Sequence, residues 1–396
     1  MEYEPIGLVN GGNLCYLNSA LQVLYSIEPL RKYLLNGAYK DAINKTNKMG
    51  TQGKMIETIA NFFNMYKNNK VDLNDILKMT QNMFPLGDQQ DSHEVLMYLI
   101  DGIHEDINTN GSFVSGLFYG KIQGSITCLS CGEKSTTTSQ IGGLSLDIPK
   151  WSEIVCDVNK MSLMKNVLVG VKGICDGRTH GSEVFVSMNH VMKKDEIVQK
   201  LSEQLKIDVS NIKTIYVTNN SLRRQVFDGE IVRFQNATIE VVGDIEQMKI
   251  FSDKTKSVTD ALKQYFTGEQ MDEWKCEKCG KRGGTKTAEM VQLPQYLILN
   301  IKLFEQTYYG YSKKSDNLSF PEEFEWGSIV GSTTTCTYKA VATINHVGYT
   351  FFGHYYSLVR VSNQWYCCND TSISKMNNGD IHRKDVYVVV YQKCEN

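Results

Sequence analysis

Residues 7–24 read GLVNGGNLCYLNSALQVL and place Cys15 between a loop rich in glycine and asparagine and an apolar helical pattern. A cysteine at the start of a helix lies at the positive end of the helix dipole, which stabilises a thiolate and lowers the pKa of the thiol. Cys15 is therefore a candidate nucleophile. The alternative is a buried, inert cysteine that only packs at the helix start, which is the usual state of a free cysteine.

A nucleophilic thiol needs an imidazole that takes its proton, and the imidazole needs a third group that orients it. Of the seven histidines, His354 lies in GHYYSLV at the start of an alternating run, and WYCCND follows in the next predicted strand. A hairpin of these two strands would bring the amide of Asn369 or the carboxylate of Asp370 to the imidazole and aim the ring at the thiolate. The alternative is an ordinary histidine in a sheet.

Two Cys-x-x-Cys pairs could bind a metal: Cys128 and Cys131 in TCLSCG, and Cys276 and Cys279 in KCEKCG. Each pair is followed by glycine, in a turn that directs two thiolates at one point, and two such pairs predict a tetrahedral zinc site. Four thiolates leave no position for a reactive water, so this zinc would be structural. The alternative is an isolated redox-active pair.

The elements that must position these residues fall into two kinds. Leu17, Leu21 and Leu24 recur at helical spacing, and amphipathic stretches continue to about residue 110. From Phe113 onward, short alternating runs such as LSLDIP, YLILNIKLF, KAVATINHV and VYVVVYQ predict strands. The sequence therefore predicts an α+β fold with a helical lobe followed by a β-rich one.

The segment 160–247 has an order of its own, with two strands, a helix and two further strands. The helix places Ile197, Leu201 and Leu205 on one face, and the segment is long enough for a small core. We interpret it as an inserted ubiquitin-like module with a β-grasp fold. Without this insert, the segment between the two cysteine pairs would be short enough to form a hairpin.

Three segments resemble the sequence boxes of ubiquitin-specific proteases: GLVNGGNLCYLNS, QQDSHEVLMYLID, and GHYYSLV with WYCCND. The resemblance covers nearly the whole chain outside the insert and includes the cysteine pairs. It implies a papain-like cysteine protease fold with thumb, palm and fingers, in which the C-terminal tail of ubiquitin runs between thumb and palm. The thumb would be residues 1–110, the fingers and palm 111–159 and 248–396, and the inserted domain 160–247.

The resemblance also implies catalytic roles. Cys15 matches the nucleophile, His354 the base and Asn369 the third member of the triad. Asp370 matches an assisting carboxylate, and Asn10 matches a donor to the oxyanion hole, whose loss typically costs about 10²–10³ in rate. Considered alone, Asn10 is also typical of a turn.

The second box places four polar residues at the start of a predicted helix: Gln89, Gln90, Asp91 and Glu94. Acids at this position complement the helix dipole and can cap free N–H groups. The resemblance implies that the four residues line the cleft for the ubiquitin tail. Gly353 and Tyr355, on either side of the histidine, are assigned to the same substrate-binding cleft.

Charge and composition exclude several classes of protein. Lys and Arg number 42 against 44 Asp and Glu, so no basic field attracts nucleic acid or a membrane surface. No apolar run approaches the roughly 18 residues of a spanning helix, and the N-terminus lacks the basic start of a signal peptide. Eleven cysteines are too few for a disulfide scaffold. We expect a cytoplasmic protein, with the nucleus left open, and a monomer by default.

The sequence thus predicts a deubiquitinating cysteine protease that hydrolyses the isopeptide or peptide bond after the C-terminal glycine of ubiquitin through an acyl-enzyme. Its partners would be ubiquitin and ubiquitinated proteins, and no cofactor would enter the chemistry. Two alternatives remain open, a catalytically silent ubiquitin-binding scaffold and a protease for another ubiquitin-like modifier. The insert could compete with ubiquitin for the enzyme or recruit another partner.

Overall fold

The structure is a computed structural model of the 396-residue chain. It describes residues 3–148, 166–175, 178–189, 191–205, 207–219, 222–233, 237–243, 256–307, 310–314, 318–349, 353–377, 381 and 385–394. The chain divides into two compact units, one of Met1–Ile148 with Ser257–Asn396 and one of Pro149–Lys256. Among the described residues, no helix is both long enough and apolar enough to span a membrane.

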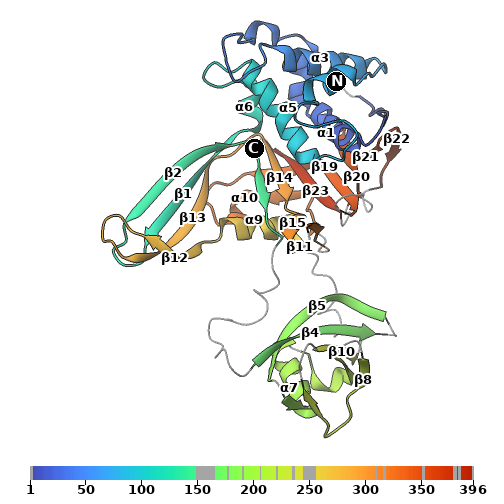
Figure 1. Ribbon diagram of the computed structural model, residues 1–396, viewed down its shortest axis with the longest axis vertical. Helices are drawn as coiled ribbons and strands as arrows, with labels where there is room; N and C mark the ends of the chain where they lie inside the picture. The colour runs from blue at the N-terminus through green and yellow to red at the C-terminus, as the bar shows by residue number, and fades with distance from the viewer. Residues whose placement is uncertain are drawn as a thin grey trace. The chain divides into compact units, whose positions relative to one another are not determined.

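The first part of unit 1 is a lobe of helices, drawn in blue to cyan in Figure 1. Its elements are α1 (Cys15–Ser26), α2 (Glu28–Leu35), η1 (Lys40–Ala42), α3 (Lys54–Lys67), α4 (Asn74–Thr80), α5 (Ser92–Asp106) and α6 (Phe113–Phe118). Every residue of α1 from Cys15 to Tyr25 is buried, so this helix runs through the core and not over its surface. This lobe is the helical segment that the apolar periodicity predicted.

The lobe packs on an eight-stranded sheet, the palm sheet, with strand order β22-β21-β20-β19-β23-β14-β3 and β18 paired to β19. The strands are β3 (Leu144–Leu146), β14 (Tyr296–Ile301), β18 (Glu323–Glu325), β19 (Thr337–Gly348), β20 (Gly353–Val361), β21 (Gln364–Asn369), β22 (Ser372–Lys375) and β23 (Val386–Lys393). Helix α1 lies against β19 and β20, and one apolar core continues from the helices into the sheet. This shared core holds the two layers together.

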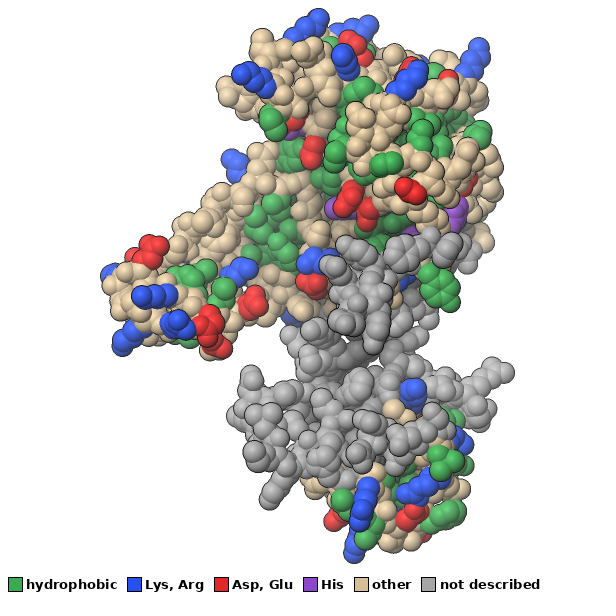
Figure 2. Space-filling model, viewed as in Figure 1, with side chains coloured by type: hydrophobic (Ala, Val, Ile, Leu, Met, Phe, Trp, Pro, Cys, Tyr) green, Lys and Arg blue, Asp and Glu red, His purple; other side chains and the backbone are tan. Residues whose placement is uncertain are grey.

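A second sheet of unit 1, the finger sheet, extends away from the helical lobe (Figure 1). Its strand order is β12-β13-β1-β2, with β1 (Gly120–Cys128), β2 (Lys134–Ile141), β12 (Glu269–Lys275) and β13 (Arg282–Gln292). Seven of the eight residues of β2 are exposed, so apolar burial contributes little here. Figure 2 shows charges of both signs at its tip, where Lys278 pairs with Glu133 and Arg282 with Glu273.

Shorter elements complete unit 1: β11 (Lys256–Ser257), α9 (Val258–Phe266), β15 (Phe304–Thr307), β16 (Gly310–Lys313), β17 (Leu318–Ser319) and α10 (Trp326–Val330). Helix α9 begins with a capping box, in which Ser257 and Asp260 each bond the other's backbone N–H. The sequence therefore returns from the insert directly into an ordered helix.

Unit 2 has a core of its own and a five-stranded sheet with order β5-β4-β10-β7-β8. Its elements are β4 (Asn166–Cys175), β5 (Arg178–Asn189), β6 (Val191–Lys193), α7 (Lys194–Leu205), η4 (Val209–Asn211), β7 (Ile212–Asn219), β8 (Leu222–Gln225), β9 (Ile231–Arg233) and β10 (Ala237–Gly243). The first and last long strands, β4 and β10, are parallel neighbours. The sequence predicted the long strands and the helix, and it missed β6, β8 and β9. Residues 160–165 and 244–247 of the predicted module lie outside the described residues.

Candidate functional site

Cys15 is the first residue of α1, and only 3% of it is exposed. Burial raises the pKa of the Cys15 thiol, whereas a hydrogen bond from the backbone N–H of Tyr355 lowers it and the charge of Asp370 raises it further. The sequence predicted a lowered pKa from the helix dipole. That prediction is wrong in direction because desolvation of the sulfur, a tertiary effect, outweighs the local donors.

The imidazole of His354 is oriented by Asn369, whose Oδ1 lies 2.6 Å from its Nε2. An amide oxygen only accepts hydrogen bonds, so Nε2 carries the ring proton and Nδ1 keeps a lone pair. The predicted hairpin is present, since β20 and β21 pair from Val361 opposite Gln364 onward. Of the two residues that the sequence offered as the third group, the structure places Asn369 at the ring.

Asp370 contacts a different group, the segment that precedes the nucleophile. Its Oδ2 accepts from Asn10 Nδ2 at 2.9 Å, and its Oδ1 accepts from Asn18 Nδ2 at 2.7 Å. Asn10 Oδ1 accepts from the backbone N–H groups of Leu14 and Gly12 at 2.9 and 3.2 Å. These contacts fix the orientation of the Asn10 amide in the segment that precedes Cys15.

Gln89 joins the loop before α5 to the strand that carries His354. Its Nε2 donates to Gly353 O at 2.6 Å, and its Oε1 accepts from Gly353 N at 3.1 Å. A Cβ on Gly353 would lie 2.0 Å from Nε2 of His346, so this position admits only glycine. Both ends of the Gln89 amide are thus used within the protein, where the sequence predicted contact with a substrate.

Two other predicted cleft residues, Asp91 and Gln90, also bond groups within the protein. Asp91 caps α5 through His93 N and Glu94 N and also accepts from the Tyr387 hydroxyl. Gln90 donates to Pro85 O at 3.2 Å. Glu94 is exposed, and partial burial and the charge of Asp91 raise the pKa of its carboxyl. Tyr355 is buried, its backbone N–H bonds the Cys15 thiol, and burial together with the charges of Asp91 and Cys15 raises the pKa of its phenol.

His346, on β19, is a buried histidine that sequence reasoning did not single out. It is 1% exposed and its ring centroid lies 4.7 Å from that of Tyr355. Burial, with the charges of Lys313 and His354, lowers the pKa of His346 to about 4. A neutral imidazole therefore lies on β19, beside the strand that carries His354.

The four cysteines of the two Cys-x-x-Cys pairs meet at the tip of the finger sheet, with their sulfur atoms within 4.8 Å of one another. Cys128 Sγ lies 3.7 Å from Cys279 Sγ, and Cys131 Sγ lies 3.7 Å from Cys276 Sγ. Four ligands at a Zn–S bond of about 2.3 Å in a tetrahedron are about 3.8 Å apart. The spacing fits a metal ion and is too long for disulfides, whose S–S distance is about 2.05 Å.

The two cysteine pairs have the same backbone fold. Gly132 N donates to Cys128 O at 3.0 Å, and Gly280 N donates to Cys276 O at 2.9 Å. Both glycines have positive φ, 71° and 68°, a conformation that side chains other than glycine rarely adopt. Each turn directs its two thiols to one side, which is the arrangement that the Cys-x-x-Cys-Gly pattern predicted.

The family model for ubiquitin carboxyl-terminal hydrolases matches residues 6–391, nearly the whole chain. The chain belongs to the ubiquitin carboxyl-terminal hydrolase family. It is 26% identical to ubiquitin carboxyl-terminal hydrolase 32 of Drosophila melanogaster over 58% of this chain and 15% of that protein. It is 23% identical to ubiquitin carboxyl-terminal hydrolase 25 of Arabidopsis thaliana over 98% of this chain and 47% of that protein. The chain thus spans less than half the length of these relatives.

Solved structures show the same fold as this chain. The SAGA DUB module of Ubp8, Sgf11, Sus1 and Sgf73 bound to monoubiquitin matches with a TM-score of 0.63 at 16% identity, over 98% of this chain and 69% of that one. The same module bound to ubiquitin aldehyde matches with a TM-score of 0.61. The predicted α+β fold is confirmed for the hydrolase, and the ubiquitin-like nature of the inserted unit stays a prediction.

Sequence reasoning missed two residues that hold the hydrolase site together, Asn18 and Ser92. Asn18 is 2% exposed on α1 and bonds Asp370, while Ser92 Oγ donates to Tyr16 O at 2.7 Å and joins α5 to α1. The available signal for Asn18 was a polar residue three positions after the cysteine, within a predicted helix that is mostly apolar.

Proposed function

We propose that this hydrolase is a deubiquitinating cysteine protease that cleaves the bond after the C-terminal glycine of ubiquitin. The observation that carries the proposal is the meeting of two distant segments. The Cys15 thiol receives a hydrogen bond from the backbone of Tyr355, the residue next to His354, and the ring of His354 is oriented by Asn369. A thiol, an imidazole with a free Nδ1 and an orienting amide are the groups that thiol-dependent acyl transfer requires.

Burial raises the pKa of the Cys15 thiol above its ordinary value, which favours the neutral thiol over the thiolate in the free enzyme. Attack therefore depends on transfer of the thiol proton to Nδ1 of His354 as the sulfur bonds to the carbonyl carbon of the terminal glycine. The C=O electron pair moves to oxygen, where the second Nδ2 hydrogen of Asn10 and the Cys15 N–H stabilise the charge.

The tetrahedral intermediate then collapses. The C–N bond breaks as the imidazolium of His354 gives its proton to the departing amine, and a thioester of Cys15 remains. Water attacks this thioester, its proton passes to Nδ1, and the C–S bond breaks. The thiol recovers its proton from the imidazolium, and ubiquitin leaves as a carboxylic acid that loses its remaining proton to solvent and becomes a carboxylate. Asn369 keeps the ring aligned through both half-reactions.

For the four cysteines at the tip of the finger sheet we propose a zinc ion, held by Cys128, Cys131, Cys276 and Cys279. The donor set and the 3.7 Å sulfur separations support this identity, because four thiolates in a tetrahedron suit zinc. The ion would cross-link the tip of a sheet whose β2 strand is almost wholly exposed. Its role would be structural, since the four sulfurs complete its coordination.

For the inserted unit, the strand order and the parallel β4–β10 pair support a ubiquitin-like module. Ubiquitin and ubiquitinated proteins are the proposed partners, as the structural neighbour bound to monoubiquitin supports. We propose a monomer in the cytoplasm; light scattering of the pure chain and microscopy of a tagged chain test these two statements.

A fluorogenic conjugate at the C-terminus of ubiquitin tests the activity, with the same conjugate of other ubiquitin-like modifiers in parallel. The wild-type chain should release the fluorophore from ubiquitin. Cys15→Ala and His354→Gln should abolish release while ubiquitin binding, measured by calorimetry, is retained. Binding without release by the wild type would establish a silent scaffold, and faster release from another modifier would reassign the substrate.

A further inference from the structure

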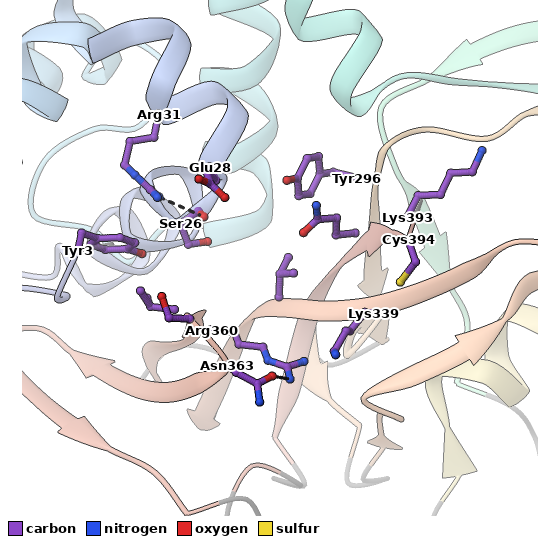
Figure 3. A pocket seen from close by; sticks show the side chains of 14 residues that line it. Tyr3, Ser26, Glu28, Arg31, Tyr296, Lys339, Arg360, Asn363, Lys393 and Cys394 are labelled. Atoms are coloured by element: carbon purple, nitrogen blue, oxygen red, sulfur yellow. Dashed lines mark hydrogen bonds between the residues drawn. The ribbon is translucent and has the colours of Figure 1, made fainter. Parts of the chain in front are cut away.

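A pocket of about 530 Å³ lies in unit 1 apart from the cysteine site (Figure 3). One side is formed by Tyr3 and the start of α2, and the other by the ends of β19, β20 and β23. None of the residues to which we assign a catalytic or metal-binding role lines it. The pocket therefore requires an explanation of its own.

Positive charge dominates the pocket. Four basic side chains line it from four elements: Arg31 on α2, Lys339 on β19, Arg360 on β20 and Lys393 on β23. One acidic residue, Glu28, also lines the pocket; its carboxylate is bonded to Lys32 at 2.7 Å and interacts with the charge of Arg31, so basic side chains remain in excess. Within the part of the chain that the structure describes, Lys339 and Lys393 form no ion pair.

One donor of the pocket lacks a partner. Arg360 Nη2 donates to Asn363 Oδ1, as the dashed line in Figure 3 marks, whereas Nη1 is buried and has no hydrogen-bond partner among the described residues. A buried guanidinium nitrogen without an acceptor is unfavourable, and a turn of the guanidinium toward an anionic oxygen in the pocket would give it one. Arginine forks are well suited to phosphate and carboxylate oxygens.

Other side chains of the pocket are already held in place. Arg31 is 7% exposed, donates to Tyr25 O at 2.7 Å and lies over the Tyr3 ring, 4.3 Å from its centroid. Burial raises the pKa of the Tyr296 phenol, which stays a neutral donor at physiological pH. Arg31 would thus need little side-chain ordering when a ligand binds, whereas Lys339 and Lys393 would be ordered by the ligand.

We propose that this pocket binds a small soluble anion carrying two or more phosphate or carboxylate groups. Its volume lies within the range of about 300–1,000 Å³ that is usual for small-molecule sites. Because α2 belongs to the helical lobe and β20 and β23 to the palm sheet, a bound anion would bridge the two layers. The proposal does not depend on the proteolytic activity.

Calorimetric titration of the full, zinc-loaded chain with tripolyphosphate, pyrophosphate and citrate tests the proposal. We expect saturable binding that weakens with salt, and tripolyphosphate should raise the melting temperature. Lys339→Gln combined with Lys393→Gln should weaken tripolyphosphate binding at least 10-fold. Lys134→Gln combined with Lys286→Gln, which removes the same charge from exposed positions on the finger sheet, should leave the affinity unchanged.

Arg360→Lys provides a second variant, which keeps the charge and removes the fork, and it should also weaken binding at least 10-fold. Equal melting temperatures of the ligand-free proteins show that the variants fold. No saturable binding of any of the three probes at millimolar concentration would overturn the proposal, as would equal weakening in the finger-sheet control. Binding only to phosphatidylcholine vesicles that contain a phosphorylated phosphatidylinositol would replace the soluble ligand by a lipid surface.

Discussion

Asp370→Asn tests the inference that Asp370 acts by holding the Asn10 amide and not by orienting the imidazole. The carboxylate accepts from Asn10 at 2.9 Å and from Asn18 at 2.7 Å. An asparagine of the same shape can accept from only one of these amides and turns its own NH₂ toward the other. Asn10 cannot rotate in response, because its Oδ1 is bonded to the N–H groups of Leu14 and Gly12.

The size of the effect follows from these bonds. Hydrogen bonds to a charged group contribute about 1.5–3 kcal/mol and neutral ones about 0.5–1.5 kcal/mol, so weakening one bond and losing the other costs roughly 2–4 kcal/mol. We expect part of this loss in the melting temperature, since Asn18 is buried, and part in kcat. A loss of about 1.4–2.7 kcal/mol in the transition state corresponds to a 10- to 100-fold lower kcat.

A double-mutant cycle with Asn10→Ala separates the two explanations. Asn10→Ala alone should lower kcat about 10²–10³-fold through loss of an oxyanion donor. In that background, Asp370→Asn should add less than about 3-fold, because the amide that it positions is gone. The assay is hydrolysis of the fluorogenic ubiquitin conjugate. Effects that multiply fully would show that Asp370 acts independently of Asn10 and would refute the assignment.

Gly353→Ala should lower kcat at least about 100-fold and destabilise the fold, because the new Cβ would lie 2.0 Å from His346 Nε2. Gly116→Ala is the control: its Cβ enters open space, so kcat and the melting temperature should stay unchanged. Elemental analysis should find zinc in the wild-type chain and none in Cys131→Ser, whose finger sheet should be open to proteases while the thiol of Cys15 keeps its reactivity; retention of zinc would contradict the site. His346 is neutral when folded, with a pKa of about 4 against 6.5, so it contributes stability above pH 6.5 that is lost as the pH falls toward 4. In urea unfolding, the free energy of unfolding of His346→Gln should fall by up to about 3 kcal/mol less than that of the wild type as the pH drops from 6.5 to 4. Identical pH profiles of the two proteins would contradict the lowered pKa of His346.

The sequence identified the groups whose signals are local. A cysteine at a helix start, a histidine opening a strand and an amide in the paired strand follow from periodicity and turn chemistry, and the hairpin register brings His354 and Asn369 together. The cysteine pairs were found in the same way, since each turn is determined by its own spacing and its glycine.

What the sequence missed depends on contacts between distant segments. The bonds of Asn18 to Asp370 and of Gln89 to Gly353 join residues 352 and 264 positions apart, and no periodic pattern encodes such pairs. The raised pKa of the Cys15 thiol is also a tertiary effect, because it follows from burial beneath β20 and not from the helix that the sequence predicted. The resemblance to a family supplied roles for Cys15, Gln89 and Asp370 without their hydrogen-bond partners, and it supplied none for Asn18.

The central claim is that Cys15 is the nucleophile and that His354 activates it. The direct measurement is reaction of the full chain with a ubiquitin that carries an electrophile at its C-terminus, followed by mass spectrometry of the modified peptide. We predict one adduct per chain, on Cys15 alone among the eleven cysteines, and no adduct with His354→Ala. An adduct on another cysteine, or undiminished labelling of Cys15 without the imidazole, would contradict the account.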